Sequence, residues 1–453
     1  MIGAGKASVS GTAELSRATL MDFHGQYPPD ALQAFASLGN NGQCPQNQER
    51  DLHRWLGELF GLKLRTYEVP MQLQVPNQPG VATIHIPFLL PHETIHYIAE
   101  SSDWQFSRSM TGGRSGGEIS EFWQHCKKHI EWADHPALAD PEVPTERLIP
   151  LNIHMDGAEF YSNSEFNVWS IGSVFAWGEV WDIKFPCCIV PHAWMQSDEV
   201  KNHVHSVVAS VLSWSLQIAT TGTGPTTGFF GEELKGHRAS LGGTCLAKGW
   251  RACYWAFKAD CKARREVHHL SRTYGHNQIC EICLAERANK KGDPLLIFKD
   301  FYPTAAHLLT QLSHDEYLRS SPTPTPWAQM PGFHIFTCFH DPMHCIFLGT
   351  AKTLLASTIG FWFRRGLLGA DDSLSELLRG LSREQTLMAK QAGLRATFRT
   401  YTPAATGLDK PSEYPELGSK YKAANIKASI WFFAKKSIQL AEQNPDEPWL
   451  MYG

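Results

Sequence analysis

Two aspartates follow apolar, strand-like segments and have the chemistry to hold a divalent metal ion. Asp156 follows segment 148–155 and precedes Gly157, and Asp260 follows segment 250–257. Carboxylates at the ends of neighbouring strands supply hard oxygen ligands for Mg²⁺ or Mn²⁺. Two such ions about 3.5–4 Å apart activate a water and stabilise a leaving oxygen. The alternative for Asp156 is an ordinary Asp-Gly turn between two hairpin strands.

The segment around Asp260 is the most basic part of the chain. Between Lys248 and Lys291 there are ten Lys and Arg against four Asp and Glu, interleaved with aromatic and histidine residues. Cations beside an acidic metal site suit a phosphodiester substrate, because phosphate contacts supply most of the sequence-independent affinity. The alternative is a solvated, charged helix face. The candidate DNA-backbone contacts are Lys258, Lys262, Arg264, Arg265 and Arg272.

Cys280 and Cys283 form a CxxC pair, which is half of a zinc site. No second pair follows at a suitable spacing. The alternative is that both cysteines pack as small apolar residues at the start of a helix. The residues that could complete a zinc site are His268, His269, His276, Cys253 and Cys261.

Asp341 and His344 lie three residues apart, at a predicted strand-to-helix junction. Such an acid and imidazole can face one site, and each can bind metal or transfer a proton. Asp341 also has the character of a helix N-cap, with Pro342 at the first helical position. The two interpretations are compatible.

Composition limits the possible classes of protein. The chain has 453 residues, of which 43% are hydrophobic and 11% aromatic, so it is long enough for two or three globular domains. Its net charge of −4 gives no overall attraction to nucleic acid. Eleven irregularly spaced cysteines, without a secretory leader, favour a reduced, intracellular protein. The longest apolar run, 354–363, is far shorter than the ~20 residues of a membrane span.

The elements that would position these residues follow from hydrophobic spacing. We expect a disordered tail over 1–46, with a short helix near 16–22 as its one ordered element. A mostly helical region is expected over 47–146, with a helix from about Glu49 and a strand over 82–87. Strands are predicted over 148–155, 167–177, 183–190 and 250–257, and a helix from Ser197.

Three strands, a helix and a further strand, with an acid after the first and last strands, are typical of a ribonuclease-H-like domain. The predicted fold class is therefore α/β, with a ribonuclease-H-like mixed sheet, flanking helices and an insertion near 261–335. We expect this core to cover 147–453 and to be truncated at its C-terminal end.

The ordered segments PLNIHMDGAEF, FKADCKARREVHHLSRTYGHNQICEICLA and DPMHCIFLGTAKTLL resemble the catalytic region of eukaryotic cut-and-paste transposases of the CACTA (En/Spm) and plavaka-like type. The resemblance covers about 148–355, near half of the chain. It implies a DDE-type core with two Mg²⁺ or Mn²⁺ ions that cleaves DNA at element ends and joins the 3′-OH to target DNA. By position, Asp156 corresponds to the first catalytic acid and Asp260 to the second, and Asp341 with His344 to a motif near the site.

The same resemblance implies double-stranded DNA as partner, a possible homo-oligomer, no membrane and a nuclear location. Its third acid, a glutamate on a later helix, has four candidates: Glu376, Glu384, Glu413 and Glu416. Without a third carboxylate one metal loses a ligand, so a catalytically inactive, transposase-derived DNA- or protein-binding protein is the alternative function. A zinc-binding interaction module built on the CxxC pair is a third hypothesis.

Overall fold

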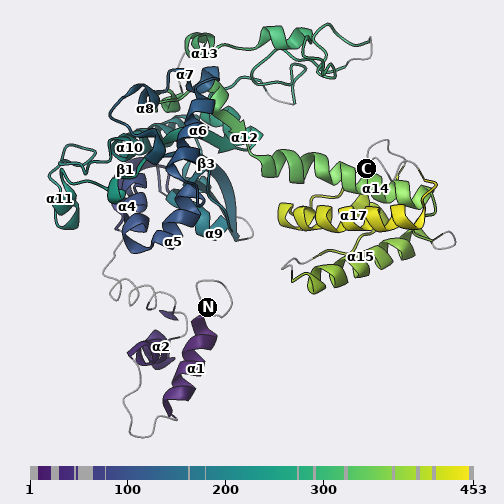
Figure 1. Cartoon of the computed structure of the whole chain (residues 1–453), viewed down its shortest axis with the longest axis horizontal. Coiled ribbons are helices and arrows are strands. Elements are labelled where there is room, and N and C mark those ends of the chain that lie inside the picture. The colour runs from purple at the N-terminus through teal and green to yellow at the C-terminus, as the bar shows by residue number, and fades with distance from the viewer. Residues whose placement is uncertain are drawn as a thin grey trace. The chain divides into compact units, whose positions relative to one another are not determined.

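The protein is described by a computed structural model, in which the chain forms two compact units (Figure 1). Unit 1 comprises Met1–Trp255 and Pro326–Phe333, and unit 2 comprises Ala256–Thr325 and His334–Gly453. The residues that the structure describes are 9–21, 30–44, 47–48, 51, 65–76, 78–161, 164–178, 180–272, 275–288, 292–320, 325–369, 373–393, 398–410 and 415–447.

The N-terminal segment is more ordered than expected. Helices α1 (Val9–Met21) and α2 (Asp30–Asn41) occupy the predicted tail. The first contains several Ala and Leu residues, which are strong helix formers, so the Gly- and Ser-rich composition around it was a poor guide. The helix predicted from Glu49 falls mostly on residues outside the described ranges.

The rest of the N-terminal region combines helices with a hairpin. Strands β1 (Tyr67–Leu73) and β2 (Ala82–Phe88) pair antiparallel; β2 was predicted and β1 was missed. The helical elements that follow are α4 (Pro91–Ser101), α5 (Asp103–Phe106), η2 (Ser107–Thr111), α6 (Gly116–Cys126), α7 (Ile130–Ala133), α8 (Pro136–Ala139) and η3 (Thr145–Arg147).

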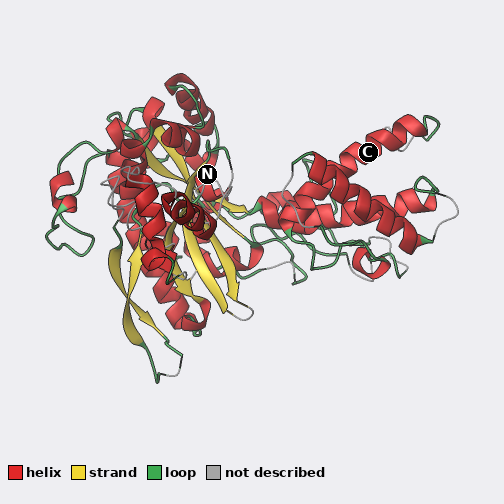
Figure 2. Cartoon of the chain, turned by 90° about the horizontal axis from the view of Figure 1, so that it is seen from below, coloured by secondary structure: helices red, strands yellow, loops and turns green. Residues whose placement is uncertain are grey.

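A five-stranded mixed sheet with flanking helices follows, so the predicted α/β class is confirmed at that level (Figure 2). Its order is β5-β4-β3-β6-β7, with β3 to β5 antiparallel and β6 parallel to β7. The bounds are β3 (Leu148–Tyr161), β4 (Ser164–Ser173), β5 (Phe185–Pro191), β6 (Arg251–Ala259) and β7 (Cys338–His340), with α9 (Val180–Ile183) and η4 (His192–Trp194) beside β5.

The expected domain boundary near residue 147 is not where the chain divides. β3 begins in contact with the N-terminal helices, because the buried Trp123 of α6 donates its indole N–H to the Leu148 carbonyl at 2.8 Å. The division instead falls within β6, after Trp255. A boundary drawn from composition could not reveal this packing.

Asp156 does not end its strand, so both sequence interpretations of its position were wrong. β3 continues to Tyr161, and Asp156 pairs with Val168 of β4 in mid-strand. Gly157 forms no turn and pairs with Asn167 of β4.

Helix α10 (Asp198–Thr221) covers one face of the sheet in unit 1. Ser197 caps it as predicted, accepting the Val200 N–H at 3.3 Å. Its His205 ring contacts Trp169 of β4, whose cross-strand partner is Met155. Because successive strand residues point to opposite faces, Asp156 lies on the face away from α10.

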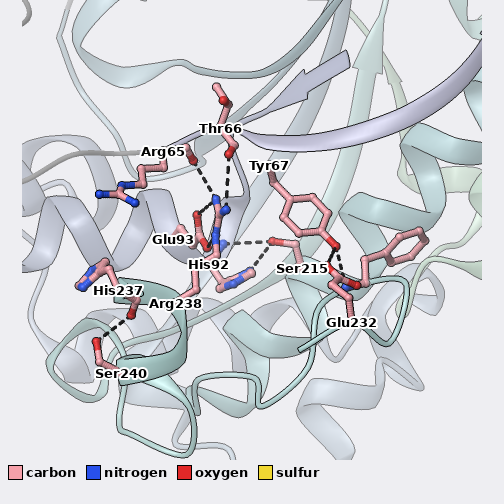
Figure 3. A network of polar contacts seen from close by, with 11 residues as sticks. Arg65, Thr66, Tyr67, His92, Glu93, Ser215, Glu232, His237, Arg238 and Ser240 are labelled. Atoms are coloured by element: carbon pink, nitrogen blue, oxygen red, sulfur yellow. Dashed lines mark hydrogen bonds and ion pairs between the residues drawn. The ribbon is translucent and has the colours of Figure 1, made fainter. Parts of the chain in front are cut away.

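A long loop between α10 and β6 is tied to the N-terminal hairpin by polar contacts (Figure 3). It contains the short helices α11 (His237–Leu241) and η5 (Ala247–Gly249). The Arg238 guanidinium binds both carboxylate oxygens of Glu93, at 2.5 and 2.9 Å, and lies over the Tyr67 ring. The Tyr67 hydroxyl in turn donates to Glu232 and accepts the Phe229 N–H. These contacts hold the loop against α4 and β1.

Unit 2 begins with α12 (Cys261–Val267) and contains a helical bundle. Its buried cluster combines residues of α14 (Ala351–Arg364), α15 (Leu374–Gln391) and α17 (Ala423–Gln443), with the Trp362 and Phe433 rings stacked at 5.1 Å. The other elements are η6 (Ala306–Thr310), α13 (His314–Ser320), η8 (Ile335–Thr337), η9 (Met343–Thr350) and α16 (Pro403–Thr406), while η7 (Pro326–Gln329) belongs to unit 1.

Segment Met343–Arg364 joins η9 to α14 across a kink at Gly349, and it is longer than the apolar run seen in the sequence. Among the described residues this 22-residue segment is long and apolar enough to cross a membrane. Length and composition do not separate such a span from a core helix, and its Leu355, Ile359 and Trp362 are buried within the unit 2 cluster.

The Glu93–Arg238 pair yields a stability prediction. Arg238→Met leaves a largely buried Glu93 without its partner, so we expect the free energy of unfolding to fall by about 3 kcal/mol. Tryptophan fluorescence during urea unfolding measures this. Lys201→Met is the control, because the Lys201–Asp198 pair is exposed and is worth under about 1 kcal/mol. Equal losses in both variants would contradict the assigned role.

His92 yields a pH prediction. Burial, assisted by the charges of Arg238 and His96, lowers the pKa of His92 from 6.5 to about 3. The unfolded chain therefore binds a proton that the folded chain does not, between these two values. Stability is fully present above pH 6.5 and falls as the pH drops toward 3, by up to about 1.4 kcal/mol per pH unit.

Urea unfolding at several pH values tests this expectation. His92→Gln should flatten the dependence between pH 6.5 and 4, whereas the exposed control His125→Gln should leave it unchanged. An unchanged slope in His92→Gln would contradict the prediction.

Candidate functional site

The candidate site in unit 2 is built on two parallel strands that end together. Ala259 of β6 pairs with His340 of β7, and the Asp341 N–H donates to the Ala259 carbonyl at 2.9 Å. Asp260 and Asp341 therefore follow adjacent strands at the same edge of the sheet. Sequence analysis singled out both residues, and only the family resemblance implied that Asp341 lies near the site of Asp260.

Asp260 begins helix α12. Its Oδ1 accepts the Ala263 N–H at 2.6 Å, so Asp260 is the N-cap of this helix. The cap uses one lone pair of Oδ1. The carboxylate of Asp260, at the edge of the sheet, can therefore still accept hydrogen bonds or bind a cation.

Asp341 and His344 form the predicted acid–imidazole pair. Asp341 Oδ2 lies 2.8 Å from His344 Nδ1, and Oδ1 accepts the Met343 N–H at 3.2 Å. Asp341 is 8% exposed, and its ion-pair geometry fixes the orientation of the half-buried imidazole. The cap and the pair are therefore both present, as the sequence allowed.

Arg264 is not a DNA-contacting residue, in contrast to the prediction. It has no exposed surface, and its Nη1 contacts the Glu281 carboxylate and the His340 ring. Arg264 lies on the inward-facing side of α12. A count of basic residues in the sequence cannot distinguish such a buried arginine from the exposed ones. The alternative of a solvated, charged helix face therefore does not extend to Arg264.

The cluster around Arg264 contains two groups that sequence analysis missed. Burial raises the pKa of the Glu281 carboxyl, and the Arg264 and Arg265 guanidinium groups oppose this shift. Burial and the Arg264 charge lower the pKa of His340 to about 4, so the imidazole is neutral at pH 7. Cys261 Sγ lies 3.5 Å from His340 Nδ1. Glu281 lies between the CxxC cysteines, which was the one sequence signal available.

The remaining predicted cations differ in exposure. Lys262 is exposed, whereas Lys258, Arg265 and Arg272 are half-buried. Lys262 and Arg265 thus retain surface beside Asp260, as a phosphate contact requires.

The CxxC pair adopts a tight local turn. Cys280 Sγ accepts the N–H groups of Ile282 and Cys283, each at 3.4 Å. Burial raises the pKa of the Cys283 thiol. Cys261 contacts His340, and the buried His268 packs on Phe257. Within the described ranges, no three or more His, Cys, Asp or Glu residues are arranged to hold a metal ion.

None of the described candidates for the third acid is shown in contact with Asp260 or Asp341. Glu376 completes a capping box with Ser373 at the start of α15, and Glu384 forms an ion pair with Lys436 at 2.8 Å. Glu416 is exposed in a loop, and Glu413 lies outside the described residues. The acid whose charge acts on Glu281 is Asp260, so Glu281 is the glutamate found near that aspartate.

Asp156 belongs to unit 1 and is half-buried on β3, on the same face as Asn152 and His154. Its carboxylate and those of Asp260 and Asp341 are the hard oxygen donors that magnesium prefers. The donor chemistry therefore fits the implied ion. No protein-family profile matches this chain, and no curated protein is significantly similar to it.

The Arg264–Glu281 pair yields a prediction. Glu281→Gln leaves a buried guanidinium without its counter-ion, so we expect a loss of about 3 kcal/mol in the free energy of unfolding. Arg264→Met should cost a similar amount. The double variant should lose at least about 1 kcal/mol less than the sum, because neither charge is then stranded. Urea unfolding of all four proteins measures the coupling, and strictly additive losses would contradict it.

Proposed function

We propose that this chain is a transposon-derived DDE-type transposase that cleaves and joins DNA strands with the help of divalent metal ions. The observation that carries the proposal is that the parallel strands β6 and β7 lie side by side and end at the same edge of the sheet. It sets Asp260 and Asp341 side by side, with His344 bound to the second carboxylate.

The sheet order supports a ribonuclease-H-like core. β3, which carries Asp156, neighbours β6, which leads to Asp260, and three antiparallel strands precede α10. Asp156 and Asp260 can come together at one metal site only if β3 and β6 are neighbouring strands.

The roles of the residues follow from their chemistry. Asp156, Asp260 and Asp341 would hold Mg²⁺ or Mn²⁺, which supplies an activated water and stabilises the leaving oxygen of the phosphodiester. His344 orients the Asp341 carboxylate through its Nδ1 bond, as imidazoles beside metal ligands commonly do. Lys262 and Arg265 would bind the DNA backbone near Asp260. In this scheme Asp341 supplies the third acid that no downstream glutamate clearly provides.

The proposal carries further expectations. Double-stranded DNA, at the element ends and at the target, would be the substrate, and the protein would act in the nucleus as a homo-oligomer. Zn²⁺ at Cys280 and Cys283 would stabilise the insertion, because the turn that holds Cys280 Sγ against the Ile282 and Cys283 N–H groups already forms half of a zinc site.

The second candidate function is a catalytically inactive, transposase-derived DNA- or protein-binding protein. The observation that favours it is that, among the described residues, no set of three metal-ligand side chains is gathered. The two functions differ in whether the acids are needed for any activity.

Nicking of supercoiled plasmid in Mg²⁺ tests the proposal. We expect nicking by the wild-type chain and its loss to background in Asp156→Asn and Asp260→Asn, because an amide cannot replace an anionic metal ligand. Asp198→Asn is the control, because this carboxylate is exposed at the start of α10. DNA binding by gel shift is measured in parallel. Wild-type binding without nicking would assign the inactive alternative, and nicking unaffected by both substitutions would exclude the proposed site.

A further inference from the structure

Unit 1 contains a cavity that the proposed function does not use. It has a volume of about 590 Å³ and lies between the end of α10, the long loop after it and the chain before β3. Its walls include Arg147, Arg251, Gly222, Thr223, Cys245 and Gly249. This volume falls in the range of small-molecule sites.

Each arginine of the cavity lies against a glycine. A Cβ on Gly222 would lie 3.2 Å from Cγ of Arg251, and a Cβ on Gly249 would lie 3.1 Å from Nη1 of Arg147. Both glycines have positive φ angles, of 70° and 83°, which other residues rarely adopt. The backbone is thus shaped so that two guanidinium groups can lie close to it.

Neutral groups hold the two arginines in place. Arg251 Nη1 donates to the Glu142 carbonyl at 2.7 Å, and Arg147 Nη1 approaches the Lys248 carbonyl at 3.5 Å. In the described structure neither guanidinium is paired with a carboxylate. Two positive charges therefore face the cavity, against the single carboxylate of Glu146.

The loop that presents these groups is strained. Ala247, Lys248 and Gly249 follow one another with φ angles of 49°, 53° and 83°. The His96 imidazole accepts the Ala247 N–H at 3.0 Å, and the Lys248 ammonium binds Asp103 at 2.9 Å. The left-handed conformation is unfavourable for non-glycine residues such as Ala247 and Lys248, and such strain clusters at ligand sites.

The backbone of the loop adds donors. Thr223 and Cys245 face each other in an antiparallel bridge whose hydrogen bonds are made by their neighbours, Gly224 N–H to Thr244 O and Leu246 N–H to Gly222 O, both within 2.9 Å. In such a pair the N–H groups of the two facing residues point out of the bridge. They remain available to an anionic ligand.

We infer that this cavity binds a phosphate ester, either of a free nucleotide or of a nucleic acid strand. Guanidinium groups bind phosphate oxygens through two parallel hydrogen bonds, and backbone N–H groups in a glycine-rich loop complete such sites. The inference does not depend on metal chemistry in the chain.

Calorimetric titration of the full chain tests it with two probes: dAMP and a 5′-phosphorylated single-stranded oligonucleotide. We expect Arg147→Gln and Arg251→Gln each to weaken binding by about 10-fold or more, because each removes a charge-assisted contact. Lys128→Gln, an exposed cation elsewhere in unit 1, should bind like wild type.

Glu146→Gln is the control for misfolding, which would also abolish binding. It removes the opposing carboxylate, so it should tighten binding, and a misfolded protein cannot show this. Arginine-dependent binding of dAMP would identify a nucleotide site, and arginine-dependent binding of the oligonucleotide alone would identify a strand site. Binding of neither probe, or binding that is insensitive to both arginines, would overturn the inference.

Discussion

The parallel pairing of β6 with β7 is the constraint on which the candidate site depends. β7 has only three residues, yet its register with β6 decides where Asp341 lies relative to Asp260. Because strand side chains alternate between faces, a slip by one residue would turn Asp341 to the other side of the sheet. A strand this short cannot hold its register by its own hydrogen bonds, so its surroundings must do so. The buried Thr337 and Cys338 at its start and the His340 contact with Arg264 at its end supply that support.

The Arg264–Glu281 ion pair connects this strand edge to the CxxC turn. Burying two charges is expensive, and an apolar pair of similar volume is often no less stable. What the pair provides is geometry: a planar guanidinium fixes Glu281 and His340 at once, which an apolar contact would do less specifically. The pair therefore links the CxxC segment to helix α12, which follows Asp260.

Basic residues have three different roles in this chain. Arg264 is a buried structural residue and Arg238 ties a loop to α4. Arg147 and Arg251 line a cavity and have no carboxylate partner among the described residues. What distinguishes the arginines is the partner that each one meets, and these partners lie from 17 to 145 residues away in the two ion pairs.

The sequence by itself determined those features that arise from local periodicity and capping. Helix α10, with Ser197 before it and a regular valine stripe, and strand β6 running into Asp260 were both evident, because hydrophobic spacing and N-cap chemistry act over a few residues. The Asp341–His344 pair was also evident, since one helical turn separates the two residues.

Only the tertiary structure decided which of these residues meet. Asp156 lies in mid-strand because β4 continues the pairing past it, and Arg264 is buried because a glutamate and a histidine from two other segments surround it. The cavity between Arg147 and Arg251 exists because a loop folds back on residues more than a hundred positions earlier. Long-range pairing of this kind leaves no periodic signal in the sequence. The roles of the charged residues can therefore be assigned only from the folded structure.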